Sequence, residues 1–113
     1  MKITPAQYYA ALGEVYEYTD RDAYVSDLCL SSIWGDSETA RIPAARIKLM
    51  GDIYDAAHRT VRDIADAAGM SMRQLAMRFA IPRRTMENWS AAPETAPIYS
   101  LMMMQEILGL IKF

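Results

Sequence analysis

Apolar residues recur at intervals of three and four along most of this chain, and this spacing restricts its fold more than any other feature. In the clearest run, seven apolar residues keep to one helical face: Ile47, Met50, Tyr54, Ala57, Val61, Ile64 and Ala68. No stretch alternates apolar and polar residues as a half-buried strand does, and no Asn-Gly hairpin signal occurs. The sequence therefore predicts an all-α fold of five to six helices.

Residues at helix ends place the first two predicted helices. Thr4 can cap backbone N–H groups and Pro5 fits the first helical position, so a helix is expected from there to about Tyr18. Asp20 is the next capping residue, and the helical spacing after it continues to about Trp34. Residues 35–41 are then predicted to form a loop.

The second half of the chain is predicted to begin with its longest helix. Pro43 starts this helix and Gly69 ends it, because glycine is favoured directly after a helix. Gly51 lies inside the helix and costs about 1 kcal/mol relative to alanine there, so a kink or break is expected at that position if anywhere. A last helix is expected over residues 97–113.

Composition excludes several classes of protein. The chain has 113 residues of which 52% are hydrophobic, enough for one helical domain over residues 1–113. It contains no apolar run long enough to span a membrane and no signal peptide, which predicts a cytoplasmic protein. With one cysteine, Cys29, and one histidine, His58, neither a disulfide, nor a metal site, nor a catalytic Cys/His pair is expected. We therefore expect no cofactor and no enzymatic activity.

Charge is unevenly distributed along the chain. Residues 1–40 hold two basic and seven acidic side chains, whereas residues 41–113 hold ten basic and seven acidic ones. Between residues 71 and 92, four arginines accompany a single acidic residue, Glu87. This distribution predicts an acidic N-terminal part with one kind of partner and a locally basic part with another.

The stretch M-S-M-R-Q-L-A-M-R-F-A-I-P-R-R-T-M-E-N-W, residues 70–89, carries the main motif. Ser71 is expected to cap a short helix, residues 80–82 to form a tight corner, and a second helix to return onto the first. Small and large apolar residues at this spacing allow two helices to cross closely. The expected core of the motif consists of Leu75, Ala76, Phe79, Ile81, Met86 and Trp89.

The order S-x-x-x-L-A-x-x-F-x-I-P-x-x-T-x-x-x-W, followed by Pro-x-Tyr at the start of a last helix, resembles the Cro and repressor family of helix-turn-helix proteins. The resemblance covers residues 61–110, and the family includes small regulators of phages and mobile elements. It implies that the helix after Pro82 is the recognition helix and that its partner is double-stranded DNA. The chain departs from the family, which commonly has glutamine where Met72 stands, glycine where Ala80 and Ala92 stand, and a basic loop where Pro93 and Glu94 stand.

Placing the second helix of the motif at 100° per residue, with Met86 and Trp89 inward, points four side chains outward as candidate base contacts. These are Arg83, Arg84, Glu87 and Asn88. Arg83 and Glu87 are four residues apart, so an ion pair on the helix surface is an equally good interpretation for them. Arginine matches the acceptors of guanine, and asparagine matches adenine. Candidate phosphate contacts are Arg73, Arg78 and Thr85.

The last predicted helix is apolar on nearly every side. Such a helix must be buried in a core or against another chain, and methionine side chains adapt to contact surfaces. Two interpretations remain open: an ordinary core helix, or a surface through which a homodimer forms. The candidate dimerisation residues are Leu101, Met102, Met103, Leu108 and Ile111.

Two classes of function fit these observations. The first is a sequence-specific DNA-binding regulator, as a dimeric repressor or autorepressor. The second is a protein interaction module on a helix-turn-helix scaffold, such as a phage-encoded inhibitor of a host defence protein of the anti-CRISPR kind. In that case the acidic residues 1–40, which are rich in tyrosine, would contact the protein partner.

Overall fold

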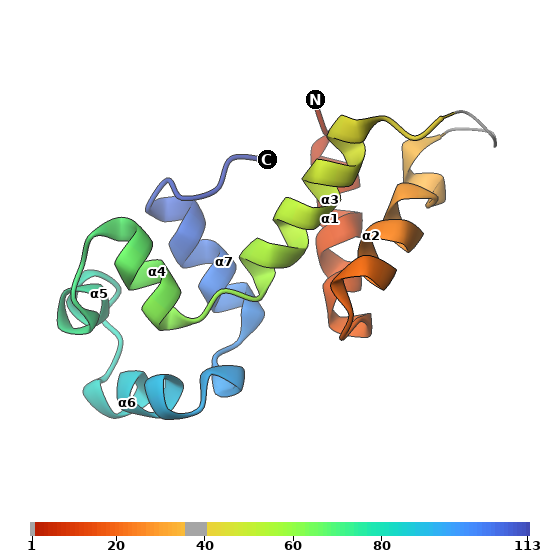
Figure 1. Cartoon of the computed structure of the whole chain (residues 1–113). Helices are drawn as coiled ribbons and strands as arrows, with labels where there is room; N and C mark the ends of the chain where they lie inside the picture. Colours follow the sequence, from red (N-terminus) through yellow and green to blue (C-terminus); the bar gives the residue numbers. More distant parts are fainter. Residues whose placement is uncertain (1, 36–40) are drawn as a thin grey trace. The chain divides into compact units, whose positions relative to one another are not determined.

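The computed structural model describes residues 2–35 and 41–113, and these ranges contain helices and connecting segments but no strand (Figure 1). The all-α prediction is confirmed, but the described residues form seven α-helices instead of five to six. They gather into two compact units, one up to Ala57 that also includes Phe113, and one from His58 to Lys112. None of the described helices is long and apolar enough to cross a lipid bilayer.

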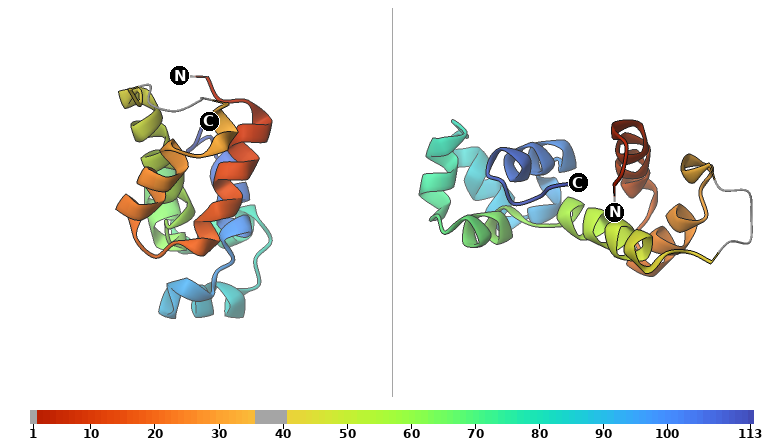
Figure 2. Two further views of the ribbon diagram at one scale, coloured as in Figure 1. Left: turned by 90° about the vertical axis from the view of Figure 1, so that its right-hand side faces the viewer. Right: turned by 90° about the horizontal axis from the view of Figure 1, so that it is seen from above.

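The first unit contains three helices, α1 (Pro5–Gly13), α2 (Arg21–Cys29) and α3 (Ala44–Ala57), whose ribbons can be followed in Figure 2. Both α1 and α2 contact α3, and each of the three helices contributes buried side chains. Tyr24 on α2 is completely buried, and its hydroxyl donates a hydrogen bond of 2.7 Å to the carbonyl oxygen of Ala11. The phenol thus contributes apolar surface without leaving a buried hydroxyl unsatisfied. Thr4 and Asp20 cap α1 and α2, as the sequence predicts.

Both of these helices end earlier than predicted. The residues after α1 form the short 3-10 segment η1 (Glu14–Glu17), and those after α2 form η2 (Ser32–Trp34). The indole of Trp34 turns back, and its Nε1 donates to the carbonyl oxygen of Leu28 at 2.8 Å. The same carbonyl, in the last turn of α2, also accepts from the N–H of Ser31 at 3.3 Å, so the indole adds a second bond where the helix ends. The loop predicted over residues 35–41 lies, for residues 36–40, outside the described residues.

The single helix predicted from Pro43 to Gly69 is wrong. The chain leaves the helix after Ala57 and starts α4 (Val61–Ala68), while α3 runs unbroken through Gly51. At the break, Thr60 Oγ1 accepts from the N–H of Asp63 at 3.1 Å, and the Asp63 carboxylate accepts from the N–H of Thr60 at 2.9 Å. This reciprocal capping box starts a new helix. The apolar residues on both sides of the break keep the same helical spacing, so the sequence pattern does not reveal the break.

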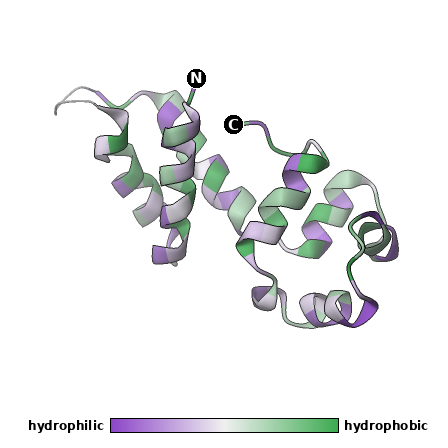
Figure 3. Cartoon of the chain, turned by 180° about the vertical axis from the view of Figure 1, so that it is seen from behind, coloured by the Kyte–Doolittle hydropathy of each residue, from purple (hydrophilic) through white to green (hydrophobic). Residues whose placement is uncertain are grey.

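The second unit contains α4, α5 (Met72–Arg78), α6 (Arg83–Ala91), the 3-10 segment η3 (Pro93–Thr95) and α7 (Ile98–Ile107). On α4 the apolar residues Val61, Ile64 and Ala65 are buried while the charged ones are exposed, so the helix is amphipathic (Figure 3). Every α-helix of the unit contributes to one buried cluster. Its members are Val61, Ile64, Ala65, Leu75, Met86, Ala96, Leu101 and Met104.

The last helix is shorter than predicted, since α7 ends at Ile107 and not at Phe113. Gly109 adopts a left-handed conformation with φ of +72°, and the N–H of Leu110 donates to the carbonyl oxygen of Gln105 at 2.9 Å. These are features of a glycine-terminated helix end, in which the backbone turns away from the helix axis. Gly69 ends α4 in the same left-handed conformation, as predicted.

Candidate nucleic-acid interface

The first helix of the motif is fixed by its own sequence. Ser71 Oγ accepts from the N–H of Gln74 at 3.1 Å, and Gln74 Oε1 accepts from the N–H of Ser71 at 2.8 Å. Two backbone N–H groups that α5 cannot pair internally are thereby satisfied. The predicted cap at Ser71 is confirmed. Because the cap defines the first residue of α5, it also fixes the position of Arg73 in the first turn of that helix.

The corner between α5 and α6 depends on Ala80, which adopts φ of +54°, a left-handed conformation that favours glycine. The N–H of Ile81 donates to the carbonyl oxygen of Ala76 at 2.8 Å, and that of Ala80 donates to Met77 at 3.4 Å. This pair of bonds ends α5, and Pro82 with φ of −57° then leads into α6. The corner is therefore short and held by backbone hydrogen bonds.

The apolar residues of the motif hold the two helices to the rest of the second unit. Leu75 and Met86 belong to its buried cluster. The other predicted core residues of the motif are partly buried and pack against that cluster: Ala76, Phe79, Ile81 and Trp89. The inner side of α6 is thus packed against the core, which holds its outer face in a fixed orientation.

The outer face of α6 carries all four candidate base contacts, and each of them is exposed. Arg83 Nε lies 2.9 Å from Glu87 Oε1, so the two side chains form the surface ion pair that their spacing allows. Arg84 and Asn88 lie on the neighbouring side of the helix. Within the described part of the chain, neither of their side chains makes a hydrogen bond or an ion pair to another residue, and both are open to solvent.

The candidate phosphate contacts lie around this face. Arg73 is exposed in the first turn of α5, and Arg78 is exposed in its last turn with Cζ 5.3 Å from the ring centre of Phe79. Thr85 is half-buried and, together with Asn88, Trp89 and Thr95, lines a shallow hollow at the edge of this face of α6. The two arginines are thus free of carboxylate partners among the described residues, while Thr85 is partly covered.

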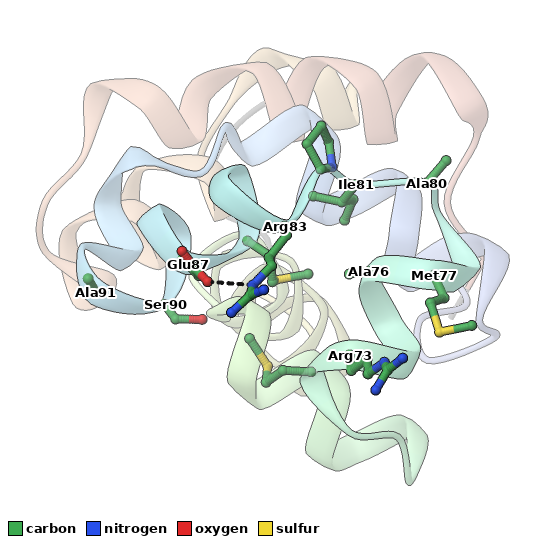
Figure 4. A pocket seen from close by; sticks show the side chains of 12 residues that line it. Arg73, Ala76, Met77, Ala80, Ile81, Arg83, Glu87, Ser90 and Ala91 are labelled. Carbon is green, nitrogen blue, oxygen red and sulfur yellow. Dashed lines mark hydrogen bonds and ion pairs between the residues drawn. The ribbon is translucent and has the colours of Figure 1, made fainter.

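A groove of about 1190 Å³ runs between α5 and α6, and Figure 4 shows the side chains that line it. Arg73 and Met77 lie on the α5 side, whereas Arg83 and Glu87 lie on the α6 side. The remaining lining residues are Met72, Ala76, Ala80, Ile81, Pro82, Met86, Ser90 and Ala91. The sequence did not indicate this groove, since its lining comes from both helices and from the corner.

The candidate dimerisation residues occupy different environments on and after α7. Leu101 and Met102 are buried, whereas Met103 is 54% exposed. Leu108 and Ile111 follow the helix and are half-buried. Tyr99 and Ile107, which the sequence did not single out, are also exposed and lie four residues before and after Met103. Residues at this spacing share one face of a helix, so these three form an apolar stripe.

A buried polar contact on α7 was also missed. Gln105 is completely buried, and its Oε1 accepts a hydrogen bond from Arg59 Nη1 at 2.7 Å. Its Nε2 donates to the carbonyl oxygen of Leu101 at 3.3 Å. The spacing of Leu101, Gln105 and Leu108 on one helical face would have placed this amide toward the core.

In residues 2–35 and 41–113, no three His, Cys, Asp or Glu side chains come together in a way that could hold a metal ion. The chain matches no protein-family model, and comparisons with curated proteins and with solved structures find no significant match.

Proposed function

We propose that this protein is a sequence-specific DNA-binding regulator in which α5 and α6 act as a helix-turn-helix and α6 enters the major groove. The observation that carries the proposal is the exposed pair Arg84 and Asn88 on a helix whose opposite side, at Met86, is packed into the core. A nine-residue helix with such a face fits the width of the major groove, which admits one α-helix.

Each outward side chain has a role that its chemistry suits. Arg84 presents a forked donor to guanine O6 and N7, and Asn88 both donates to and accepts from adenine. Arg83 and Glu87 read bases as a pair or hold each other at the edge of the interface. Arg73 and Arg78 contact phosphates and set the position of α6 on the duplex, with Thr85 as a further phosphate contact.

The regulator acts in the cytoplasm as a homodimer, as a repressor of another promoter or as an autorepressor of its own. The exposed apolar stripe on α7 supports this part of the proposal, because an apolar helix face is stabilised when a second chain covers it. Two copies related by a two-fold axis would place their recognition helices about 34 Å apart, one turn of DNA. The operator is then an inverted repeat.

Selection of bound duplexes from a random pool tests the proposal directly. A palindromic sequence whose half-sites lie about ten base pairs apart is the expected result. Fluorescence anisotropy with random duplex DNA should also show binding that weakens steeply as salt is added, because phosphate contacts release counterions. A protein that binds neither pool nor random DNA at low salt is not a DNA-binding regulator.

The second candidate is a protein interaction module, such as an inhibitor of a host defence protein. It is favoured by two tyrosines of the first unit, Tyr9 and Tyr16, which are 67% and 60% exposed, and by the exposed acidic residues Glu14 and Glu17 of the same unit. Exposed tyrosine is enriched in protein interfaces. Absence of DNA binding in the anisotropy experiment, together with capture of one basic protein that Tyr9→Ala abolishes, would favour this function.

A further inference from the structure

The groove between α5 and α6 is lined mainly by apolar side chains, which the proposed contacts with duplex DNA do not use. Its volume of about 1190 Å³ is somewhat larger than the range typical of small-molecule sites. DNA presents phosphates and hydrogen-bonding base edges, and only the thymine methyl group is apolar in the major groove. Most side chains lining the groove are nevertheless apolar, so contact with DNA leaves the floor uncovered.

The apolar residues of the groove are suited to a protein partner. Met77 is 72% exposed, and Met72 and Ala76 beside it are half-buried. Methionine side chains are unbranched and polarizable, and they adapt to the shape of a bound apolar surface. Short helices dock into such grooves by placing apolar residues from successive turns between the walls.

The charges at the rim select among such helices. Arg73 stands on the α5 wall, and no carboxylate pairs with it in the described part of the chain. Arg83 on the α6 wall is paired with Glu87, the only acidic residue among those that line the groove. This ion pair leaves the charge of Arg73 uncompensated. The rim therefore has an excess of positive charge, which attracts an acidic segment and disfavours a basic one.

We propose that this groove binds an acidic amphipathic helix of a partner protein, with its apolar side chains against Met77 and Ala76 and its carboxylates at Arg73 and Arg83. Because Arg83 and Glu87 also belong to the proposed DNA interface, the partner and DNA would exclude each other. This consequence rests on the proposed function. The partner helix would then release the regulator from its operator.

Selection from a displayed library of random twelve-residue peptides tests the docking site on the intact chain. Enriched peptides should carry several Asp or Glu residues and apolar residues at helical spacing. A fluorescently labelled enriched peptide should lose roughly tenfold or more in affinity on Met77→Gln, the usual size of a hot-spot loss. Leu30→Gln is the matched control, since Leu30 is 74% exposed, much as Met77 is, but lies at the end of α2 outside the groove.

Several outcomes would overturn the docking proposal: no enrichment, enrichment of basic peptides, or an affinity that Met77→Gln leaves unchanged. The relation to DNA is tested in a separate experiment, in which random duplex DNA competes with the labelled peptide for the protein. If peptides bind at the groove but DNA does not bind at all, docking stands and the proposed regulator function fails. If DNA binds but no acidic peptide is enriched, the docking proposal fails alone. Displacement of the bound peptide by DNA supports both.

Discussion

The guanidinium of Arg21 on α2 lies directly against the backbone of Gly51 on α3. A methyl group at position 51 would overlap Nη2 of Arg21 and would lie 3.1 Å from its Cζ. The same guanidinium holds Asp55 one turn further along α3, with Nε 2.8 Å from Oδ1 and Nη2 3.2 Å from Oδ2. A glycine inside α3 is therefore explained by the side chain that packs over it, and no kink accompanies it.

This contact predicts a non-additive pair of substitutions. Gly51→Ala gains helix propensity of up to about 1 kcal/mol, but it displaces the Arg21 guanidinium from Asp55, and the loss of this exposed ion pair offsets part of the gain. The net change in unfolding free energy should be small. In an Arg21→Ala background the clash is absent, so Gly51→Ala should stabilise by about 0.5–1 kcal/mol. Urea denaturation followed by circular dichroism measures both, and equal effects in the two backgrounds would contradict the contact.

Ala80→Gly should stabilise the second unit. The left-handed backbone at Ala80 costs alanine about 1 kcal/mol that glycine does not incur. The greater freedom of glycine in the unfolded chain offsets part of this gain, leaving about 0.5 kcal/mol. Ala67→Gly, at an exposed position inside α4, is the control and should destabilise by about 1 kcal/mol. Thermal melting compares the two; a lower melting temperature for Ala80→Gly would show that the corner does not have this conformation.

Arg84→Ala and Arg73→Ala should weaken DNA binding in different ways. Loss of Arg84 should cost about 1–3 kcal/mol on the selected operator and relax the preference at one base pair, with less effect on random DNA. Loss of Arg73 should weaken all sequences alike and reduce the slope of affinity against salt by about one unit. Anisotropy titrations on selected and random duplexes separate the two. Specificity that survives both Arg84→Ala and Asn88→Ala would remove α6 from the role of recognition helix.

The stripe on α7 predicts a dimer that one substitution can dissociate. Sedimentation at micromolar concentration should show twice the monomer mass of 12.8 kDa. Met103→Glu places a charge at the centre of the stripe between Tyr99 and Ile107, and should return the protein to the monomer because an unpaired charge is costly in an apolar interface. Leu30→Glu introduces the same charge at an exposed position outside α7 and is the control. A wild-type protein that sediments only as the monomer would contradict the stripe as an interface.

Cys29 should react slowly with thiol reagents in the native protein. Burial raises the pKa of its thiol, and the opposing effect of Arg46 on this pKa is smaller. A raised pKa means less thiolate at neutral pH, and only the thiolate is nucleophilic. Labelling should therefore shift to higher pH than for a free cysteine, and it should become fast in denaturant. Native labelling at the rate of an exposed cysteine would show that α2 does not bury this side chain.

Local sequence alone determined where several helices begin and end. Thr4, Asp20 and Ser71 were identified as caps because the hydrogen bonds that define a cap join residues only three apart, so no distant part of the chain is needed. Gly69 was identified for a similar reason, since its left-handed conformation depends on the absence of its own side chain. The ion pair of Arg83 and Glu87 also follows from spacing along one helix.

Only the tertiary structure decided the features that join distant residues. The apolar spacing was continuous from Ile47 to Ala68, yet the helix breaks at residues 58–60. Burial of an apolar face stabilises two short helices as well as one long helix, so the spacing does not show whether the helix is continuous. The position of Arg21 over Gly51 and the burial of Gln105 against Arg59 depend on pairs separated by 30 and 46 residues. The groove likewise depends on the tertiary structure. Its walls come from two helices whose crossing is set by core packing, and no spacing within either helix encodes the space between them.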